Sequence, residues 1–346
     1  MISFECDYNN GAHPKVLENL IKYNDAKPTP YGFDEFSERA KERIRVACGL
    51  PDAQIFFLTG GTQTNATTID SMLYQYEGVI CVGSGHINVH EAGAVELGGH
   101  KVIALQGEQG KLRVKALRQW LSDFYADPTW PHMVQPGMVY ISFPTEYGTI
   151  YSKDELADIH RVCADYGLPL MVDGARLGYG LMCPEADITL EDLARLCDVF
   201  YIGGTKNGAL FGEAIVFNDP DLYPDFDYVR KERGALLAKG WLLGAQFGEL
   251  FKDNLYFKIA KHANVLAKKL STALKEAGFE FLADSPTNQV FPIVTKQEMA
   301  TLAKKYIFEE WQPIDEEHSA IRFVTSWATE EAHVDELIKD VIDLRR

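Results

Sequence analysis

Two reactive polar residues each follow a short apolar segment of the kind that forms a buried strand. Lys206 follows VFYIG in the stretch FYIGGTKNG, and Asp173 follows LPLMV in the stretch VDGAR. A lysine in a Gly-rich turn can be partly desolvated, which lowers the pKa of its amine and allows it to form a Schiff base with an aldehyde. A carboxylate at a strand end can pair with the protonated nitrogen of an aromatic ring. Each residue also has an ordinary interpretation: Lys206 as a surface lysine, and Asp173 as a helix cap paired with Arg176.

The stretch TGGTQTN (59–65) has the features of an anion-binding turn, because it joins an apolar segment to one expected to be helical. Gly60 and Gly61 let backbone amides converge, Thr62 adds a hydroxyl, and a helix N-terminus favours an anion such as phosphate. The stretch is neither GxGxxG nor a loop ending in GK[ST], so it does not favour a nucleoside triphosphate. A Gly-Gly turn before a helix is also common without any ligand.

Two further motifs carry residues suited to planar or anionic ligands. His86 and His90 in HINVHE have the i, i+4 spacing of metal ligands, but the order differs from HExxH and no third ligand is evident. Zinc is therefore disfavoured, and His86 is either stacked on a planar ligand or packed in the core. Arg322 alternates with apolar residues in AIRFVTSW, so one face of this expected strand carries a charge. It is suited either to gripping a carboxylate or to facing water at a sheet edge.

The segments around these residues predict a sheet covered by helices. Near-continuous apolar runs predict strands at 54–59, 79–83, 100–105, 138–143 and 213–217. Two further strands are expected within 168–176 and 198–206, each running into a polar turn that contains glycine. Helical segments are expected from Thr62, over 87–97 and over 111–125. Another is expected from an N-cap at Ser152, with Glu155 three residues on, to Gly167. This alternation is typical of a mostly parallel α/β sheet, in which ligands bind at the carboxyl ends of the strands.

The pattern changes after residue 217. Residues 241–278 look mostly helical, short strands are expected around 288–294 and 320–327, and a helix ends the chain. We therefore expect a large domain over 1–240, with Asp219, Pro220 and Pro224 near its end. A small C-terminal α+β domain is expected over 241–346, and the first residues of the chain are expected to pack on it.

The composition excludes several classes of function. The chain has 346 residues, and 34 Lys plus Arg against 50 Asp plus Glu give a net charge of −16. Such a charge disfavours nucleic-acid binding, which depends on basic side chains. No run has the length of a membrane span, and the N-terminus lacks the pattern of a signal peptide. The 6 cysteines include no CxxC pair, which is typical of a reduced, cytoplasmic protein.

The order of these motifs resembles the L-threonine aldolase and β-eliminating lyase family of fold-type-I pyridoxal-phosphate enzymes. The matching stretches are SFECDYNNGAHP, PYGFDEF, TGGTQTN, GHINVHEAGA, VDGARLG, CDVFYIGGTKNG and IRFVTSW. The resemblance implies an aspartate-aminotransferase-like fold, pyridoxal 5′-phosphate as the cofactor, no metal, and a homodimer or homotetramer that acts on a small amino acid.

The resemblance also implies roles for individual residues. Those for binding the cofactor are the phosphate contacts Gly61, Thr62 and Thr205, the ring-stacking His86, the ring-nitrogen partner Asp173 and the aldimine-forming Lys206. Arg176 and Arg322 would hold the substrate carboxylate, and Tyr31 in PYG matches a tyrosine near the family's active site. His86 is also a candidate catalytic base.

The activity implied is that of a carbon–carbon lyase, which cleaves L-threonine or L-allo-threonine to glycine and an aldehyde. Two positions depart from the family pattern. Glu146 replaces a histidine, and Leu237 replaces an arginine for which Lys239 is a candidate substitute. Glu146 can serve as a base if burial raises its pKa. It can equally indicate another reaction of the same cofactor on another amino acid, as in a β-eliminating lyase or an aminotransferase.

Overall fold

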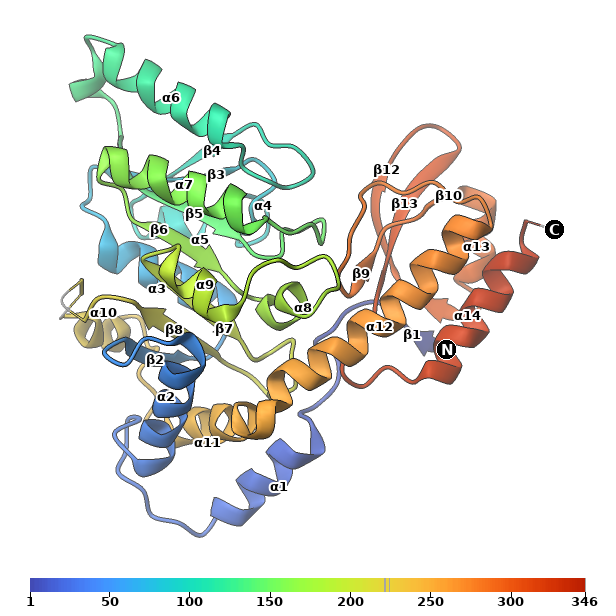
Figure 1. Cartoon of the computed structure of the whole chain (residues 1–346), viewed down its shortest axis with the longest axis horizontal. Helices are drawn as coiled ribbons and strands as arrows, with labels where there is room; N and C mark the ends of the chain where they lie inside the picture. The colour runs from blue at the N-terminus through green and yellow to red at the C-terminus, as the bar shows by residue number, and fades with distance from the viewer. Residues whose placement is uncertain (221, 224, 346) are drawn as a thin grey trace.

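The computed structural model describes residues 1–346 except 221, 224 and 346. Pro224, one of the residues expected near the end of the large domain, therefore lies outside the described residues. The central element is a seven-stranded sheet in the order β2-β8-β7-β6-β5-β3-β4 (Figure 1). Its strands, in that order, are Gln54–Leu58, Glu213–Phe217, Val199–Gly203, Leu170–Asp173, Gln135–Ser142, Glu77–Val82 and Lys101–Leu105.

The sheet is mostly parallel, as predicted, but β8 runs antiparallel to both of its neighbours. The connection between β7 and β8 covers only residues 204–212, which is too short for the helical crossover that a parallel neighbour requires. As a result, the first residue of β8, Glu213, lies beside the carboxyl ends of β2 and β7, paired with Leu58 and Gly203.

Helices cover both faces of this sheet (Figure 1). Alternate strand residues point to opposite faces, so Met171 and Val172 belong to different hydrophobic clusters. The larger cluster packs against α2 (Glu35–Cys48), α6 (Val114–Ala126), α7 (Lys153–Tyr166), α9 (Leu190–Arg195) and α11 (Trp241–Leu250). The smaller cluster packs against α3 (Gly61–Met72), α5 (Ala94–Leu97) and α10 (Phe226–Glu232).

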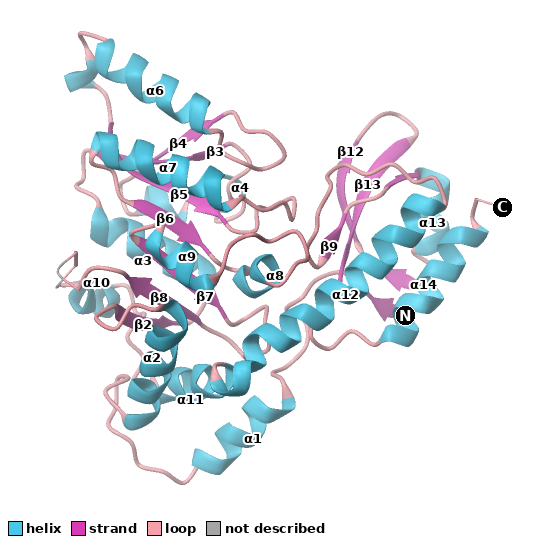
Figure 2. Ribbon diagram, in the orientation of Figure 1, coloured by secondary structure: helices cyan, strands magenta, loops and turns pink. Residues whose placement is uncertain are grey.

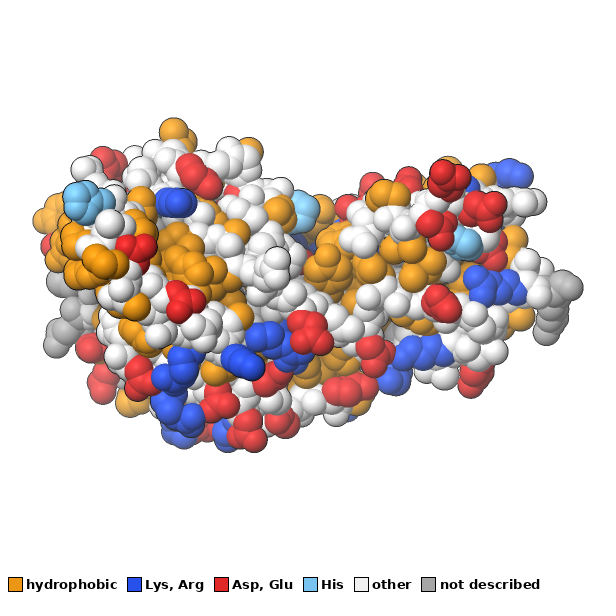
Figure 3. Space-filling view, turned by 90° about the horizontal axis from the view of Figure 1, so that it is seen from above, with side chains coloured by type: hydrophobic (Ala, Val, Ile, Leu, Met, Phe, Trp, Pro, Cys, Tyr) orange, Lys and Arg blue, Asp and Glu red, His pale blue; other side chains and the backbone are white. Residues whose placement is uncertain are grey.

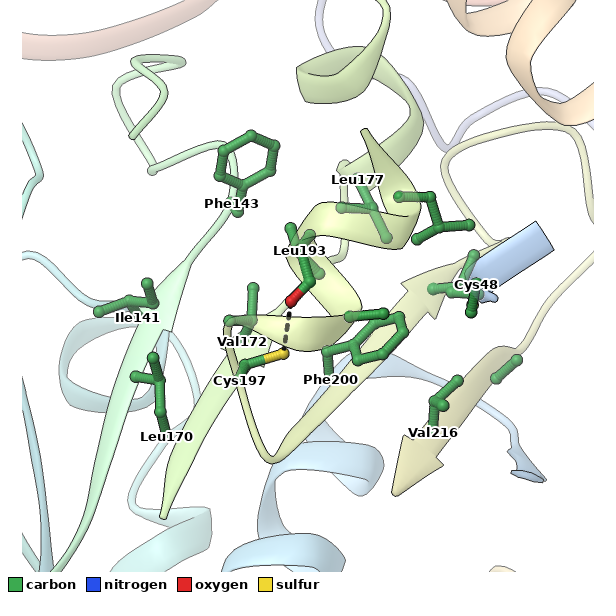
Figure 4. Close-up of a cluster of buried hydrophobic side chains, with 14 of the residues drawn as sticks. Cys48, Ile141, Phe143, Leu170, Val172, Leu177, Leu193, Cys197, Phe200 and Val216 are labelled. Carbon is green, nitrogen blue, oxygen red and sulfur yellow. Dashed lines mark hydrogen bonds between the residues drawn. The ribbon is translucent and has the colours of Figure 1, made fainter. Parts of the chain in front are cut away.

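Buried thiols contribute to the larger cluster (Figure 4). Cys197 packs near Cys48 and Phe200, and its Sγ donates a hydrogen bond to the backbone oxygen of Leu193 at 3.2 Å. Burial raises the pKa of Cys48 to about 12. All six cysteines are free, and all except the half-buried Cys6 are buried. These thiols act as small apolar side chains rather than as nucleophiles.

The second unit is built on the 22-residue helix α12 (Leu255–Glu276), which runs from the sheet to the C-terminal part of the chain (Figure 2). Its start packs in the core of the large sheet, whereas Leu266 and the residues after it pack in a separate core. The other elements here are β9 (Gln289–Val290), β10 (Ile293–Thr295), α13 (Lys296–Leu302), β11 (Tyr306–Ile307), β12 (Glu309–Pro313), β13 (His318–Val324) and α14 (Glu331–Asp343). The N-terminal β1 (Ile2–Ser3) pairs with β11. Figure 3 shows a notch in the surface between the two units.

Short elements complete the fold: α1 (Pro14–Tyr23), α4 (His86–Val89), η1 (Trp130–His132), α8 (Leu177–Leu181) and η2 (Lys252–Asn254). In the described part of the chain, no helix combines the length and apolar character needed to cross a membrane. The helix that begins at Ser152 has the predicted form, with a capping box between Ser152 and Glu155 and a left-handed Gly167 at its end.

Two interpretations of the sequence were wrong in detail, and some elements were not anticipated. The single helix expected over 87–97 is two short helices, α4 and α5, because Ala92 and Gly93 between them have positive φ angles of 50° and 75°. β11, β12 and α13 were not anticipated, since their segments lack a clear apolar period. The interpretation of Arg322 as an edge residue facing water is also wrong: β13 lies between β10 and β12, and Arg322 is 7% exposed.

Candidate active site

Most of the predicted polar residues meet at one edge of the large sheet, where they line a cavity of about 200 Å³. The strand order sets the order of its walls. The start of α3 follows β2, Lys206 follows β7, Asp173 ends β6, and Glu146 follows β5. In the order of the strands across the sheet, the cavity wall is therefore formed by a helix N-terminus, an amine, a carboxylate and a second carboxyl group.

Lys206 is held in a tight turn after β7. The turn is closed by a hydrogen bond from the Asn207 amide to the Gly204 oxygen at 2.9 Å, and the Tyr179 hydroxyl donates to the Lys206 oxygen at 2.6 Å. Burial, followed by the positive charge of Arg176, lowers the pKa of the Lys206 amine. A larger fraction of this amine is therefore uncharged and nucleophilic than for a lysine in water.

Asp173 is 4% exposed and is surrounded by donors. Its Oδ2 accepts hydrogen bonds from the Asn65 side chain at 3.0 Å and the Tyr140 hydroxyl at 2.5 Å. Its Oδ1 accepts one from the Ala175 amide at 2.9 Å. Burial acts to raise the pKa of Asp173, but His86 and these side-chain donors outweigh it, so the net shift is downward. Among the described residues no arginine is paired with Asp173, and hydrogen-bond donors hold it as a buried anion.

His86 and Asp173 belong to one hydrogen-bonded network. His86 Nδ1 lies 2.7 Å from Glu91 Oε1, and the same oxygen accepts a hydrogen bond from Asn65 Nδ2 at 2.8 Å. Asn65 therefore bridges Glu91 and Asp173. His90 lies beside His86, with ring centroids 5.4 Å apart. This network fixes the orientation of the His86 imidazole at the cavity wall.

Glu146 is held by one oxygen and leaves the other without a partner. Its Oε1 accepts hydrogen bonds from Ser142 Oγ at 2.6 Å and from the His86 amide at 2.9 Å. Its buried Oε2 has no hydrogen-bond partner among the described residues. Burial raises the pKa of Glu146, and the hydrogen bond from Ser142 opposes this only in part. The group is therefore suited to taking up a proton from a bound molecule.

The opposite end of the cavity is the N-terminus of α3. None of the described side chains caps this helix, so its first amides remain available to an anion. A Cβ atom at Gly61 would lie 3.1 Å from the Tyr201 hydroxyl, which explains the use of glycine there. Thr59, Gly60 and Thr62 also line this end.

The two arginines lie at the outer wall of the site, and each already has an acidic partner. Arg176 is paired with the buried Asp7. Arg322 donates to Gln289 Oε1 at 2.9 Å and forms an ion pair with Glu309. A second cavity of about 250 Å³ contains both arginines and shares Lys206, His86 and Glu146 with the first. The small unit thus supplies one wall of the candidate site.

Three of the residues named from the resemblance are not brought to this site within the chain. Tyr31 is exposed, with the amine of Lys231 4.7 Å from its ring centroid. Lys239 is exposed, and Leu237 packs against the core of the large sheet. None of the three lines either cavity.

Sequence reasoning missed four buried residues of the site: Asp7, Asn65, Glu91 and Glu213. Asn65 and Glu91 lie within motifs already selected, TGGTQTN and HINVHE, but their roles depend on contacts across the fold. Glu213 begins a strand rather than ending one, so a search of strand carboxyl ends passes over it. Asp7 lies within the family-matching stretch SFECDYNNGAHP, but its pairing with Arg176 depends on a contact across the fold.

The fold and the cavity at the carboxyl ends of the strands define the class of protein, which is fold type I, the aminotransferase-like α/β class. A variant of Thermus thermophilus aspartate aminotransferase shares this fold, with a TM-score of 0.71 at 12% identity over 99% of this chain and 91% of the other. The predicted fold class is therefore confirmed.

Within this class, the chain belongs to the β-eliminating lyase family, whose sequence profile matches residues 21–326. A low specificity L-threonine aldolase from a Pseudomonas species is 33% identical over 98% of this chain and 96% of its own length. The structure of a threonine aldolase from Leishmania major is 41% identical, covers 100% of both chains and has a TM-score of 0.96. The family resemblance seen in the sequence motifs is confirmed.

Proposed function

We propose that this protein is a pyridoxal-phosphate-dependent carbon–carbon lyase. It cleaves β-hydroxy-α-amino acids of the L-threonine and L-allo-threonine type to glycine and an aldehyde. The observation that carries the proposal is the presence of Lys206, with a lowered pKa, and Asp173, held as an anion, in one cavity. Nearly full-length similarity to proteins named threonine aldolases supports the choice of reaction.

The cavity fits pyridoxal phosphate. This cofactor carries an anionic phosphate, an aldehyde and a ring nitrogen that must stay protonated, and the walls offer an uncapped helix N-terminus, an amine and a buried carboxylate. Gly61, Thr62 and Thr205 would hold the phosphate, Lys206 the aldehyde, Asp173 the ring nitrogen, and His86 one face of the ring. When bound, the cofactor supplies an electron sink for the bond that breaks.

The chain's own residues bind the substrate and move its proton. Arg322 would hold the substrate carboxylate, with Arg176 beside it, and so orient the scissile bond. We assign Glu146 Oε2 to take the proton of the β-hydroxyl group, directly or through one water, because that oxygen is buried and has no partner among the described residues. His86, fixed by Glu91, is the second candidate for this proton.

We further propose a cytoplasmic homodimer or homotetramer with no nucleic-acid or membrane partner. Tyr31 supports a shared site, because it matches an active-site tyrosine of the family but is exposed and lines neither cavity in the single chain. Six free cysteines are consistent with a reducing compartment. Light scattering of the purified protein tests the assembly, and a monomer at micromolar concentration would contradict it.

A substrate panel tests the reaction. The purified protein is incubated with L-threonine, L-allo-threonine and phenylserine, and the products are identified. Glycine plus an aldehyde is the expected result. A 2-oxo acid plus ammonia would indicate β-elimination instead, and conversion of the cofactor to its amine form would indicate an aminotransferase. Borohydride should attach the cofactor to the wild-type protein but not to Lys206→Ala, with Lys258→Ala, an unrelated lysine on α12, as the control.

A further inference from the structure

Glu213 is a buried acidic residue of the cavity for which neither the family motifs nor the proposed reaction provides a role. It lies at the start of β8, between Leu58 of β2 and Gly203 of β7. The first of these strands leads into the N-terminus of α3, and the second leads to Lys206. Glu213 is therefore positioned between the anion-binding end of the cavity and the reactive amine. It is 3% exposed and lines the same cavity as Gly60 and Gly61.

The carboxyl group of Glu213 is held at the cavity wall by the turn between β7 and Lys206. Glu213 Oε2 accepts a hydrogen bond from the Gly204 amide at 3.0 Å, and the Thr205 side chain also hydrogen-bonds to the carboxyl group. Thr205 Oγ1 accepts a hydrogen bond from the Gly212 amide at 2.9 Å. A hydroxyl has one proton, so Thr205 Oγ1 can donate either to Glu213 or to a phosphate, but not to both.

Among the described residues, no basic side chain is available to balance the charge of a phosphate at this end of the cavity. Within the described residues, Glu213 forms no ion pair, and the basic side chains lining the cavity are His86, Arg176 and Lys206. Arg176 is committed to Asp7, and Lys206 is required for the aldehyde. An ionised carboxylate beside a phosphate dianion in a buried cavity would be strongly repelled. One proton shared between the two groups removes this repulsion.

The protonation of Glu213 is consistent with that arrangement. Burial raises its pKa to about 7, although the hydrogen bond from Thr205 and the charge of Lys206 act in the opposite direction. A neighbouring anion raises the pKa of a carboxyl group further. The uncharged acid is therefore accessible at neutral pH.

We propose, building on the proposed cofactor, that Glu213 binds the phosphate group as an uncharged carboxylic acid and donates its proton to a phosphate oxygen. In this arrangement Glu213 is a donor rather than a repelling charge, and the affinity for the cofactor depends on its protonation. The phosphate is released more easily as the pH rises, because the donor becomes an anion.

The test compares two ligands that differ only in the phosphate. Dissociation constants of pyridoxal phosphate and of pyridoxal are measured by equilibrium dialysis between pH 6 and 9, using full-length protein freed of cofactor. The proteins are wild type, Glu213→Gln, and Glu77→Gln as a control at the opposite edge of the sheet. Glutamine keeps a donor but does not titrate. The ratio of wild-type to Glu213→Gln affinity for pyridoxal phosphate should therefore fall with rising pH, by up to about tenfold per pH unit above the pKa. For pyridoxal the ratio should stay constant.

Each of the other outcomes contradicts either this proposal or the proposed function. A ratio independent of pH for pyridoxal phosphate overturns the proposal, as does an equal change for pyridoxal, which would show that Glu213 acts on Lys206. Failure of the wild type to bind pyridoxal phosphate at all would instead overturn the proposed function. If Glu213→Gln does not fold, the phosphorus NMR signal of the cofactor on the wild type gives the answer. A shift that changes through pH 6 to 9 supports the shared proton, and a constant shift contradicts it.

Discussion

Asp7 and Arg176 form a buried ion pair with two contacts, Nε to Oδ2 at 2.8 Å and Nη2 to Oδ1 at 3.0 Å. Asp7 Oδ2 also accepts a hydrogen bond from Asn288 Nδ2 at 2.9 Å. One carboxylate therefore joins the N-terminal segment, the loop after β6 and the small unit. The pair occupies two of the nitrogen atoms of Arg176, so that residue's role toward a substrate carboxylate stays a prediction.

We expect Asp7→Asn to destabilise the protein by about 3–5 kcal/mol, because it leaves the buried charge of Arg176 without its partner. The free energy of unfolding in urea at pH 7 measures this change. Asp52→Asn, at an exposed position, is the control and should have little effect. A loss below about 1 kcal/mol would mean that the pair does not hold the units together.

The Asp7–Arg176 ion pair also predicts how the free energy of unfolding depends on pH. Burial acts to raise the pKa of Asp7, but Arg176 and Lys206 outweigh it and the net shift is downward. A carboxyl group with a lowered pKa contributes stability above its unfolded value, and that contribution is lost as the pH falls through the folded value. The difference in stability between wild type and Asp7→Asn should therefore be constant near neutrality and shrink below pH 3.8, the ordinary value.

Glu146→Gln should lower kcat by about 10²-fold or more, because an amide cannot take up a proton. In the wild type the ionised form is active, so kcat/KM should fall as the pH falls through the raised pKa of Glu146. This acid limb should disappear in the variant. Ser142→Ala is a matched variant: it removes a hydrogen bond that lowers this pKa, so the acid limb should move to higher pH. Unchanged activity of Glu146→Gln would assign the proton to His86.

Asp173→Asn should lower kcat by about 10- to 10²-fold, because the ring nitrogen of the cofactor loses a charge-assisted hydrogen bond of about 1.5–3 kcal/mol. Tyr140→Phe removes one donor to the same carboxylate but keeps its charge, so its effect should be smaller. Steady-state kinetics and the absorption spectrum of the bound cofactor measure both variants. If the two substitutions have equal effects, the hydrogen bond from Tyr140, rather than the charge of Asp173, determines the protonation of the cofactor's ring nitrogen.

The sequence reveals Lys206 and Asp173 because each follows an apolar strand whose carboxyl end, in a parallel sheet, lies at the ligand edge. The capping box of Ser152 and Glu155 is equally local and was predicted correctly. Glu213 depends on the reversed direction of β8, which no local pattern encodes. The acidic partners of the two arginines depend on contacts between segments far apart in the chain. Local chemistry is therefore predictable from sequence, whereas partners brought together by tertiary packing are not.

Glu309 and Arg322 lie opposite each other on adjacent antiparallel strands and form an ion pair at the wall of the second cavity. The guanidinium of Arg322 also lies 4.8 Å from the ring centroid of Trp311. Under the proposed function, in which Arg322 holds the substrate carboxylate, Glu309 would compete with the substrate for Nη2 of Arg322.

We therefore expect Glu309→Gln to lower the KM for the amino acid and leave kcat nearly unchanged. Glu309 is partly exposed, and a screened ion pair is worth about 0.5–1 kcal/mol, so the expected change is about two- to fivefold. Glu310→Gln is the matched control, because that side chain instead accepts a hydrogen bond from Ser319. Arg322→Lys should raise KM, since lysine cannot form the two parallel hydrogen bonds that arginine offers to a carboxylate. If Glu309→Gln raises KM as Arg322→Lys does, then Glu309 positions Arg322 for the substrate rather than competing with it.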